Sequence, residues 1–373
     1  MKKIIDLGMH PYADTFISKN QQDLSEPVYN LQCGLDEDTG EVRLMVDTKA
    51  DERYNLYNYS YTSSNSSFSR NHWNDYASTV NNKLNLNSPS KILEIGSNDG
   101  YLSSQFSKCG HKVIGVDPSL FMCDLANSLG IDTCNALFDK SLSQSLKEDI
   151  GEVDLVVANN VFNHTNDTDD FIQGVANILN AEGCFVFELP YWLCTIRDKK
   201  FDQIYHEHVT YFTVKYSQNL LSKVGMTIQD VEVVDYHGGS LRVYAGFGDK
   251  ISEKVKKLIK EEEDFGLFRQ DTYVNFMKEI TEKRNKFMKN IYEIKSKGYP
   301  IVAVGAAAKG NTLLNFYNLD NSIIDYVTDS SEYKKGKYTP LTRIPITGDE
   351  IFENYENVYA LIFSWNISTT LID

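Results

Sequence analysis

One stretch decides the fold of this 373-residue chain: Lys91-Ile92-Leu93-Glu94-Ile95-Gly96-Ser97-Asn98-Asp99-Gly100-Tyr101-Leu102. It predicts an apolar strand, a tight turn that contains glycine, and the start of a helix. Such a unit opens the ligand crevice of doubly wound α/β folds. The turn lacks the G-x-G-x-x-G spacing of dinucleotide folds, and Asp99 stands where a pyrophosphate would lie. A dinucleotide is therefore disfavoured.

The acidic turn favours a cationic cofactor without phosphate. S-adenosylmethionine (SAM) has a sulfonium charge, an amino group and a ribose diol, all of which favour nearby carboxylates. A second predicted strand, residues 111–117, ends in Asp117, about twenty positions after the turn, where a ribose-binding acid is expected. In the alternative interpretation, Glu94 and Asp117 only cap helices or solvate loops. The predicted cofactor contacts are Glu94, Gly96, Asn98, Asp99, Asp117, Asn159 and Asn160.

Further apolar runs predict how the chain is organised. Strands are expected at 130–134, 153–158 and 184–188 with helices between them, which indicates a parallel doubly wound sheet. A charged helical run at 251–297 precedes new strands at 299–305 and 323–328, so a second nucleotide-type sheet is expected, with a purely structural βαβ unit as the alternative. We predict an N-terminal module with a Tyr/Ser lid at 1–75, a cofactor domain at 76–247 and a C-terminal domain at 248–373. The Tyr/Asn/Ser tract at 51–72 is either a linker or a cover over a polar ligand.

Composition excludes several partners. A net charge of −15 argues against nucleic acid and against an anionic membrane surface. No apolar run reaches the ~18 residues of a membrane span, and the six cysteines form no C-x-x-C pair. We expect a cytoplasmic protein with reduced cysteines, either a monomer or a small homo-oligomer.

The densest group of titratable residues lies at 201–212, where Tyr205, His206, Glu207, His208 and Tyr211 follow one another closely. A metal site, a proton-transfer site and a structural loop are the competing interpretations. Proton transfer is favoured because histidine titrates near neutral pH and a glutamate is available to orient an imidazole. Two other polar segments are expected at strand edges, Asn159–His164 and His237–Arg242, and Arg242 is suited to pair with a phosphate or carboxylate.

Together the motifs E-I-G-S-N-D-G (94–100), N-N-V-F-N-H (159–164), Y-H-E-H (205–208), H-G-G-S-L-R (237–242) and A-K-G-N-T-L-L-N (308–315) resemble those of the SAM-dependent sugar C-methyltransferases. The resemblance covers nearly the whole chain. It implies a small N-terminal zinc module, a SAM-binding Rossmann-like domain and a second, C-terminal Rossmann-like domain. It also implies a nucleotide-linked ketosugar as substrate.

The same resemblance implies roles for individual residues. His208 would be the general base, supported by Tyr205 and Glu207, with His164 on the opposite wall near the transferred methyl. Tyr61 would belong to a lid, since Tyr59-Ser60-Tyr61-Thr62-Ser63 matches the family's Y-x-Y-x-S segment. The substrate contacts expected are His206, His237, Arg242, Lys309, Asn311 and Thr312. Tyr205, His206 and Lys309 are the candidates for stabilising an enolate oxygen.

The N-terminal module departs from the family pattern. Its first C-x-x-C pair is missing, and the second would fall at Asp36 and Thr39, with only Cys33 nearby. A lone thiol cannot build a tetrahedral zinc site, so we predict no zinc and no other metal. The module would then hold its shape by packing and hydrogen bonds.

Two other functions stay open from the sequence. O- or N-methylation of a nucleotide sugar on the same scaffold also needs a base, but no adjacent ketone. A non-catalytic sugar-nucleotide binding protein is the alternative outside enzymes, although the complete Y-H-E-H segment argues against it.

Overall fold

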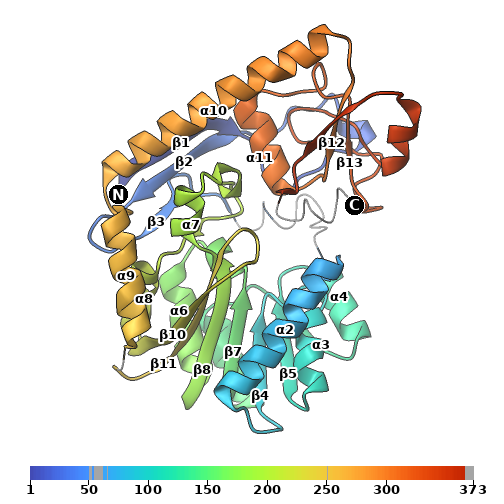
Figure 1. Ribbon diagram of the computed structural model, residues 1–373. Helices are drawn as coiled ribbons and strands as arrows, with labels where there is room; N and C mark the ends of the chain where they lie inside the picture. The colour runs from blue at the N-terminus through green and yellow to red at the C-terminus, as the bar shows by residue number, and fades with distance from the viewer. Residues whose placement is uncertain (50–52, 54–61, 65, 250, 366–373) are drawn as a thin grey trace.

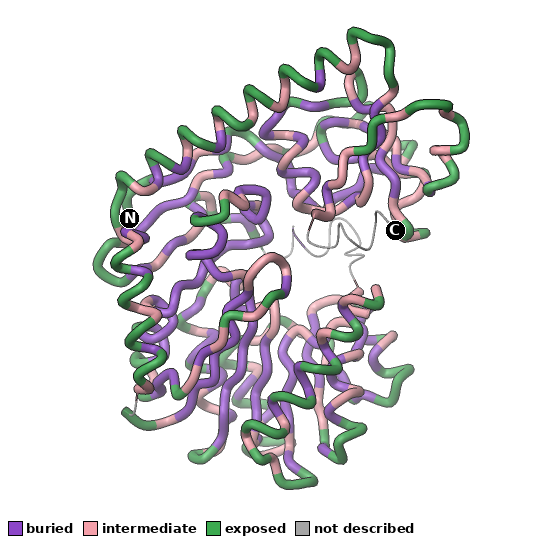
Figure 2. Tube along the Cα trace, viewed as in Figure 1, coloured by how far each residue is buried: buried purple, intermediate pink, exposed green. Residues whose placement is uncertain are grey.

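The structure, a computed structural model, describes residues 1–49, 53, 62–64, 66–249 and 251–365 (Figure 1). Within this part of the chain the strands form three sheets, one of seven strands and two of four. Figure 2 shows that the strands are the most buried elements, whereas long stretches of α10 are exposed.

The large sheet has the order β10-β11-β8-β7-β4-β5-β6. Its strands are β4 Lys91–Ile95, β5 Lys112–Asp117, β6 Asp132–Asn135, β7 Val153–Asn159, β8 Leu179–Pro190, β10 Met226–Val234 and β11 Ser240–Phe247. The predicted α/β Rossmann-like fold is confirmed, and β4 to β8 are the strands expected for it. The predicted strands β4 to β8 pair parallel, as expected, while β10 and β11, which the sequence did not predict, extend the sheet antiparallel. A tight turn joins β10 and β11, in which His237, Gly238 and Gly239 have left-handed φ angles of 50°, 80° and 113°.

Helices cover the faces of this sheet (Figure 1). They are α2 Ser67–Leu84, α3 Tyr101–Lys108, α4 Leu120–Ser128, α5 Lys140–Ile150, α6 Thr168–Ile178, α7 Trp192–Arg197 and α8 Val214–Ser222. Several begin at a side chain that accepts from the first-turn backbone, as Asp139 does from Leu142 N at 2.6 Å and Thr213 from Tyr216 N at 3.0 Å. Short 3-10 turns lie at Lys19–Gln21 (η1), Phe162–His164 (η2), Phe201–Gln203 (η3) and Asp349–Asn354 (η4).

The N-terminal module is a sheet of β1 Lys2–His10, β2 Tyr29–Leu35, β3 Val42–Leu44 and β9 Thr210–Tyr211. Its last strand therefore comes from the chain that directly follows Y-H-E-H. Cys33 is buried in β2 at 0% exposure, among apolar neighbours of the core. No three His, Cys, Asp or Glu residues of the described ranges are grouped to hold a metal ion.

The described part of the C-terminal region contains three α-helices and a parallel sheet with the order β14-β13-β12-β15. The elements are α9 Glu253–Phe265, α10 Gln270–Ser296, β12 Ile301–Val304, α11 Ala308–Tyr317, β13 Tyr326–Thr328, β14 Ile346–Thr347 and β15 Tyr359–Ile362. In Figure 1, α9 and α10 run along one side of the molecule, and α10 packs against β1. These helices connect the lobe that holds the large sheet to the lobe that holds β12 and β13.

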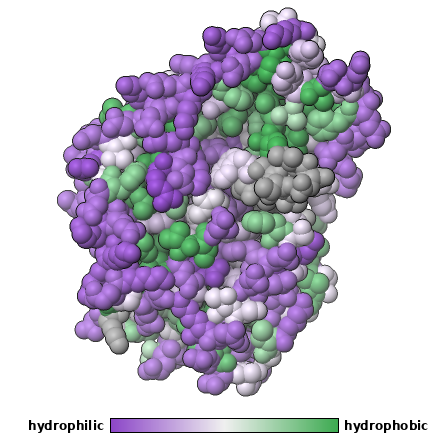
Figure 3. All heavy atoms as spheres, in the orientation of Figure 1, coloured by the Kyte–Doolittle hydropathy of each residue, from purple (hydrophilic) through white to green (hydrophobic). Residues whose placement is uncertain are grey.

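Hydrophilic residues dominate the face of the molecule seen in Figure 3. Among the helices that the structure describes, none is both long enough and apolar enough to cross a membrane.

One buried carboxylate ties α9 to the large-sheet lobe. Glu262 is 0% exposed and accepts from Val214 N at 2.5 Å, Lys215 N at 3.0 Å and the Tyr191 hydroxyl at 2.8 Å. Its oxygens thus satisfy two of the unpaired N–H groups at the start of α8. Burial raises the pKa of Glu262 to about 7, against the lowering effect of these hydrogen bonds.

We predict that Glu262→Ala lowers the free energy of unfolding by about 3 kcal/mol, because two buried donors and one half-buried donor lose their acceptor. Urea denaturation followed by circular dichroism measures the change. Glu261→Ala on the exposed face of α9 is the matched control, with an expected change below about 0.5 kcal/mol. Equal effects of the two substitutions would contradict the role given to Glu262.

Candidate active site

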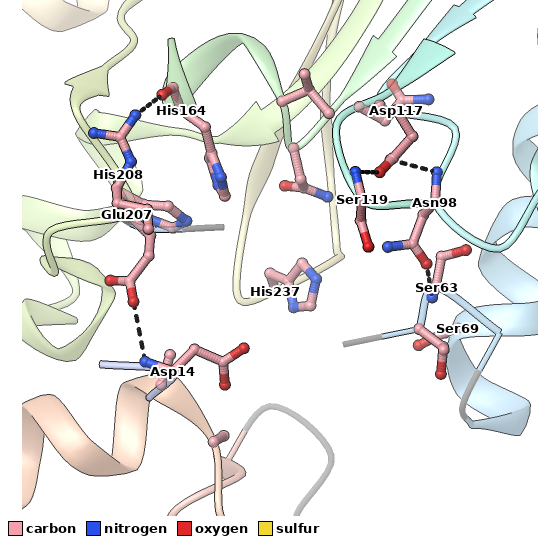
Figure 4. Close-up of a pocket in the computed structure, with 18 of the residues that line it drawn as sticks. Asp14, Ser63, Ser69, Asn98, Asp117, Ser119, His164, Glu207, His208 and His237 are labelled. Carbon is pink, nitrogen blue, oxygen red and sulfur yellow. Dashed lines mark hydrogen bonds between the residues drawn. The ribbon is translucent and has the colours of Figure 1, made fainter. Parts of the chain in front are cut away.

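A cavity of about 900 Å³ lies where the three parts of the chain meet. The large sheet contributes Gly96, Asn98 and Asp117, the Y-H-E-H segment contributes Tyr205 and His208, and the C-terminal region contributes Lys309. In Figure 4, Asn98 and Asp117 lie on one side of the cavity and His164 and His208 on the other. The other predicted residues that line it are Glu94, Asn159, Asn160, His164, Glu207 and His237.

The cofactor turn is built around Gly96. Its φ is +68°, and a Cβ atom at this position would lie 2.1 Å from Val161 Cγ2. Gly96 N and Ser97 N both donate to Val116 O, at 2.7 and 3.1 Å, so the turn is fastened to the end of β5. Only glycine allows the backbone to pass this close to Val161.

Acidic side chains line the same end of the cavity. Asp117 accepts from Asn98 N and Ser119 N, both at 2.9 Å, and burial raises its pKa (Figure 4). Each of its oxygens keeps a lone pair for a ligand hydroxyl. Burial raises the pKa of Glu94 to about 8, although the Ser103 hydroxyl donates to it. A cationic ligand with a diol fits this set of acceptors, and SAM is such a ligand.

Asp99 departs from the predicted cofactor contact. It does not line the cavity, because its carboxylate accepts from Ser63 Oγ at 2.5 Å, Ser64 Oγ at 2.6 Å and Ser64 N at 3.1 Å. It therefore anchors residues 62–64 over the turn. Tyr61, the predicted lid residue, lies outside the described residues.

His208 and Tyr205 form a hydrogen-bonded pair at the cavity wall. The Tyr205 hydroxyl lies 2.7 Å from His208 Nε2, and His208 Nδ1 lies 2.9 Å from Gln203 O. A carbonyl only accepts, so Nδ1 carries the hydrogen and Nε2 accepts from Tyr205. Burial lowers the pKa of His208 to about 3, which keeps the imidazole neutral. The ring of His164 lies 5.1 Å away, and burial lowers its pKa as well.

Glu207 points toward the N-terminal module. Its carboxylate accepts from Asp14 N at 3.0 Å and from Ala13 N at 3.4 Å (Figure 4). Burial raises its pKa to about 7. The imidazole of His208 is oriented by Gln203 O and Tyr205, so the orienting role that the sequence suggested for Glu207 falls to these two groups.

His206 and Arg242 are engaged inside the protein rather than at the cavity. His206 is 0% exposed, with its ring nitrogens 3.3 Å from Pro11 O and 3.4 Å from Asn30 O. Arg242 Nε donates to Glu188 at 2.7 Å. Neither residue lines the cavity. The substrate contacts expected for them are not supported by this geometry, because their polar groups are already satisfied.

In the A-K-G-N-T segment, one of the predicted residues lines the cavity and the other two form hydrogen bonds inside the protein. Lys309 lines the cavity with Nζ 3.4 Å from His237 Nδ1, and burial lowers the pKa of both groups. Asn311 instead donates to Ala13 O at 2.6 Å, and Thr312 Oγ1 donates to Ile204 O at 3.3 Å. These two side chains join parts of the protein and do not reach the cavity.

Several cavity residues escaped prediction, among them Asp14, Arg53 and Lys334. Arg53 donates to His164 O at 2.9 Å and to Asn166 Oδ1 at 2.6 Å, which fixes the turn that carries His164. Arg53 and Lys334 lie in short charged stretches of the kind common on protein surfaces, and Asp14 is a single charge, so none of the three belongs to a motif that indicated a ligand site.

Comparison with known proteins adds two family matches. A model described as "Methyltransferase domain" matches residues 70–231, and one described as "C-methyltransferase C-terminal domain" matches residues 235–373. The chain is 29% identical over 294 residues to C-methyltransferase NovU from Streptomyces niveus, an alignment that covers 78% of this chain and 70% of NovU.

Two solved structures align with about half of the chain. Magnesium protoporphyrin IX methyltransferase (ChlM) from Synechocystis is 16% identical, with 48% of this chain and 83% of ChlM covered and a TM-score of 0.38. A SAM-dependent methyltransferase from Clostridium acetobutylicum is 15% identical, with 48% and 92% covered and a TM-score of 0.39.

The family matches, together with the Gly96 turn and Asp117, define a SAM-dependent methyltransferase. The C-terminal region is similar to that of C-methyltransferases, and the chain as a whole is similar to NovU.

We predict that Gly96→Ala weakens SAM binding at least tenfold. A tenfold change corresponds to a change in binding free energy of about 1.4 kcal/mol, which is within the cost of backbone strain at such a position. The new Cβ would clash with Val161 and would require a left-handed φ. Isothermal titration calorimetry measures the affinity. Gly130→Ala is the matched control, since Gly130 has a φ of +80° but no atom within 4 Å of an added Cβ. An unchanged affinity in Gly96→Ala would overturn the assignment of this turn.

Proposed function

We propose that this enzyme methylates a ring carbon of a nucleotide-linked ketosugar next to its ketone. The observation that supports this best is the neutral His208–Tyr205 pair, which faces the same cavity as the Gly96 turn. A carbon acceptor needs a base and an acidified C–H bond, whereas the cofactor turn alone would serve any methyltransferase. The resemblance of the Y-H-E-H segment to sugar C-methyltransferases supplies the substrate class.

His208 Nε2 is the group that removes the proton. The C–H bond breaks, the proton moves to Nε2, and the electron pair passes into an enolate whose carbon then accepts the methyl group. When bound, SAM supplies that methyl as an electrophile. The Tyr205 hydroxyl donates to Nε2 in the structure, so it must turn away as the proton arrives. That movement frees Tyr205 to donate to the enolate oxygen, where a preorganised donor is worth a few kcal/mol.

Lysines at the C-terminal side suit an anionic nucleotide. Lys309 is a buried ammonium whose pKa is lowered by burial, and Lys334 lines the same cavity while donating to Ala306 O at 2.6 Å. A diphosphate beside Lys309 would offset the loss of hydration of the ammonium group. The acidic end near Asp117 is left for the cofactor.

We predict that His208→Asn lowers kcat by roughly 10²- to 10⁴-fold, the usual contribution of a positioned base. SAM affinity should stay within about twofold, because His208 does not belong to the Gly96 turn. Steady-state kinetics and calorimetry measure the two effects. Tyr205→Phe should retain more activity than His208→Asn, since it removes the donor and leaves the base. Near-normal turnover in His208→Asn would rule out this base.

A second prediction separates carbon methylation from O- or N-methylation on the same scaffold. In deuterated water, the C-methylation route exchanges the carbon-bound proton next to the ketone, because His208 forms an enolate there. Mass spectrometry of recovered ketosugar measures the exchange. Methyl transfer to oxygen or nitrogen without exchange would favour the other reaction. Absence of SAM binding would favour a non-catalytic sugar-nucleotide binding protein.

A further inference from the structure

A turn of the N-terminal module, residues 11–15, reaches the cavity beside the Y-H-E-H segment. Three contacts fix it: the Glu207 carboxylate accepts from Asp14 N at 3.0 Å and from Ala13 N at 3.4 Å, and Asn311 Nδ2 donates to Ala13 O at 2.6 Å. Glu207 and Asn311 are 5% and 2% exposed. Two buried polar side chains from different parts of the chain therefore hold this turn in place.

The side chain that this turn presents to the cavity is Asp14. Figure 4 shows its carboxylate pointing into the open space, on the side where His237 lies. Among the described residues, no hydrogen bond or ion pair is made by this carboxylate. Burial raises the pKa of Asp14, an effect that Lys334 and Lys337 oppose and Asp329 reinforces.

Asp14 is half-buried, so its carboxylate keeps only part of its hydration inside the cavity. A ligand that brings a donor gives this acceptor a partner in place of water. Because the backbone of Asp14 is already fixed, little ordering is needed when the ligand arrives.

We propose that Asp14 is a substrate-binding residue, which accepts a hydrogen bond from a donor substituent of the sugar ring, either a hydroxyl or an ammonium group. This rests on the proposed function. The donor should lie on the part of the acceptor that faces the base, because Asp14 and His208 line the same cavity. Asp14 would thereby select acceptors by the substituent near the ketone.

The test deletes the donor from the substrate and the acceptor from the protein. Thymidine- and uridine-diphosphate ketosugars that carry a hydroxyl, an amino group or only hydrogen beside the ketone are compared as acceptors for the wild-type enzyme, Asp14→Ala and Asp14→Asn. With the preferred donor-bearing acceptor, Asp14→Ala should raise KM about tenfold or more, as expected for one charged hydrogen bond. With the acceptor that carries only hydrogen beside the ketone, the KM values of the wild-type enzyme and Asp14→Ala should agree within about twofold. Asp14→Asn should recover most of the loss for a hydroxyl and little for an ammonium group.

The controls separate a contact from a structural effect. Asp23→Ala, at an exposed position of the same module, should leave all acceptors unchanged, and SAM affinity should be the same in each variant. An Asp14→Ala loss of equal size on donor-bearing and hydrogen-bearing acceptors would overturn the proposal, as would no loss at all. If the wild-type enzyme binds SAM but methylates none of the acceptors, the proposed function fails first and the role of Asp14 fails with it.

Discussion

The hydrogen bonds from Ala13 and Asp14 to the Glu207 carboxylate are the contact on which the rest of the site depends. They join the N-terminal module to the segment that carries His208. Just beyond, Thr210 and Tyr211 continue that segment into the N-terminal sheet by pairing with Arg43 and Val42. Asn311 adds α11 of the C-terminal region through Ala13 O. A single turn of backbone thus has contacts with all three parts, so the cavity walls are fixed relative to one another.

The lysines of the cavity lie on one side of it. Asp117 and Glu94 line the carboxyl edge of the large sheet, while Lys309 and Lys334 come from the C-terminal region, where Asp329, Glu332 and Asp349 also line the cavity. Burial raises the pKa of both carboxyl groups and lowers that of Lys309. Without a ligand, burial therefore destabilises the ionised form of each of these side chains. A cation beside the two carboxyl groups and an anion beside Lys309 would relieve this destabilisation. In the proposed function, the cation would be the sulfonium cofactor and the anion the diphosphate of the acceptor.

The sequence was sufficient where the chemistry is local and failed where partners are distant. The positive φ of Gly96 and the place of Asp117 follow from one strand-turn-helix unit, so the sequence located both residues, whereas Asp99 accepts from Ser63 and Ser64 instead of lining the cavity. Within Y-H-E-H, by contrast, His206 bonds with Pro11 O, about two hundred residues away in the chain, and Glu207 with the neighbouring turn. Similarly, Asn311 in A-K-G-N-T joins α11 to the N-terminal module. A motif shows which residue types occur together, but it does not show where each side chain points. That direction depends on which distant backbone groups need a hydrogen-bond partner.

Burial lowers the basicity of His208, and the proposed substrate would restore part of it. Loss of hydration is the largest cause of its low pKa, and repulsion from Lys309 lowers the pKa further. A neutral imidazole is then always ready, yet it is a weak base. A diphosphate bound near Lys309 would cancel much of that repulsion, because opposite charges at short range favour the protonated ring. In the proposed reaction, the anionic part of the acceptor would therefore strengthen the base that acts on its carbon, so that proton removal begins only once the acceptor is in place.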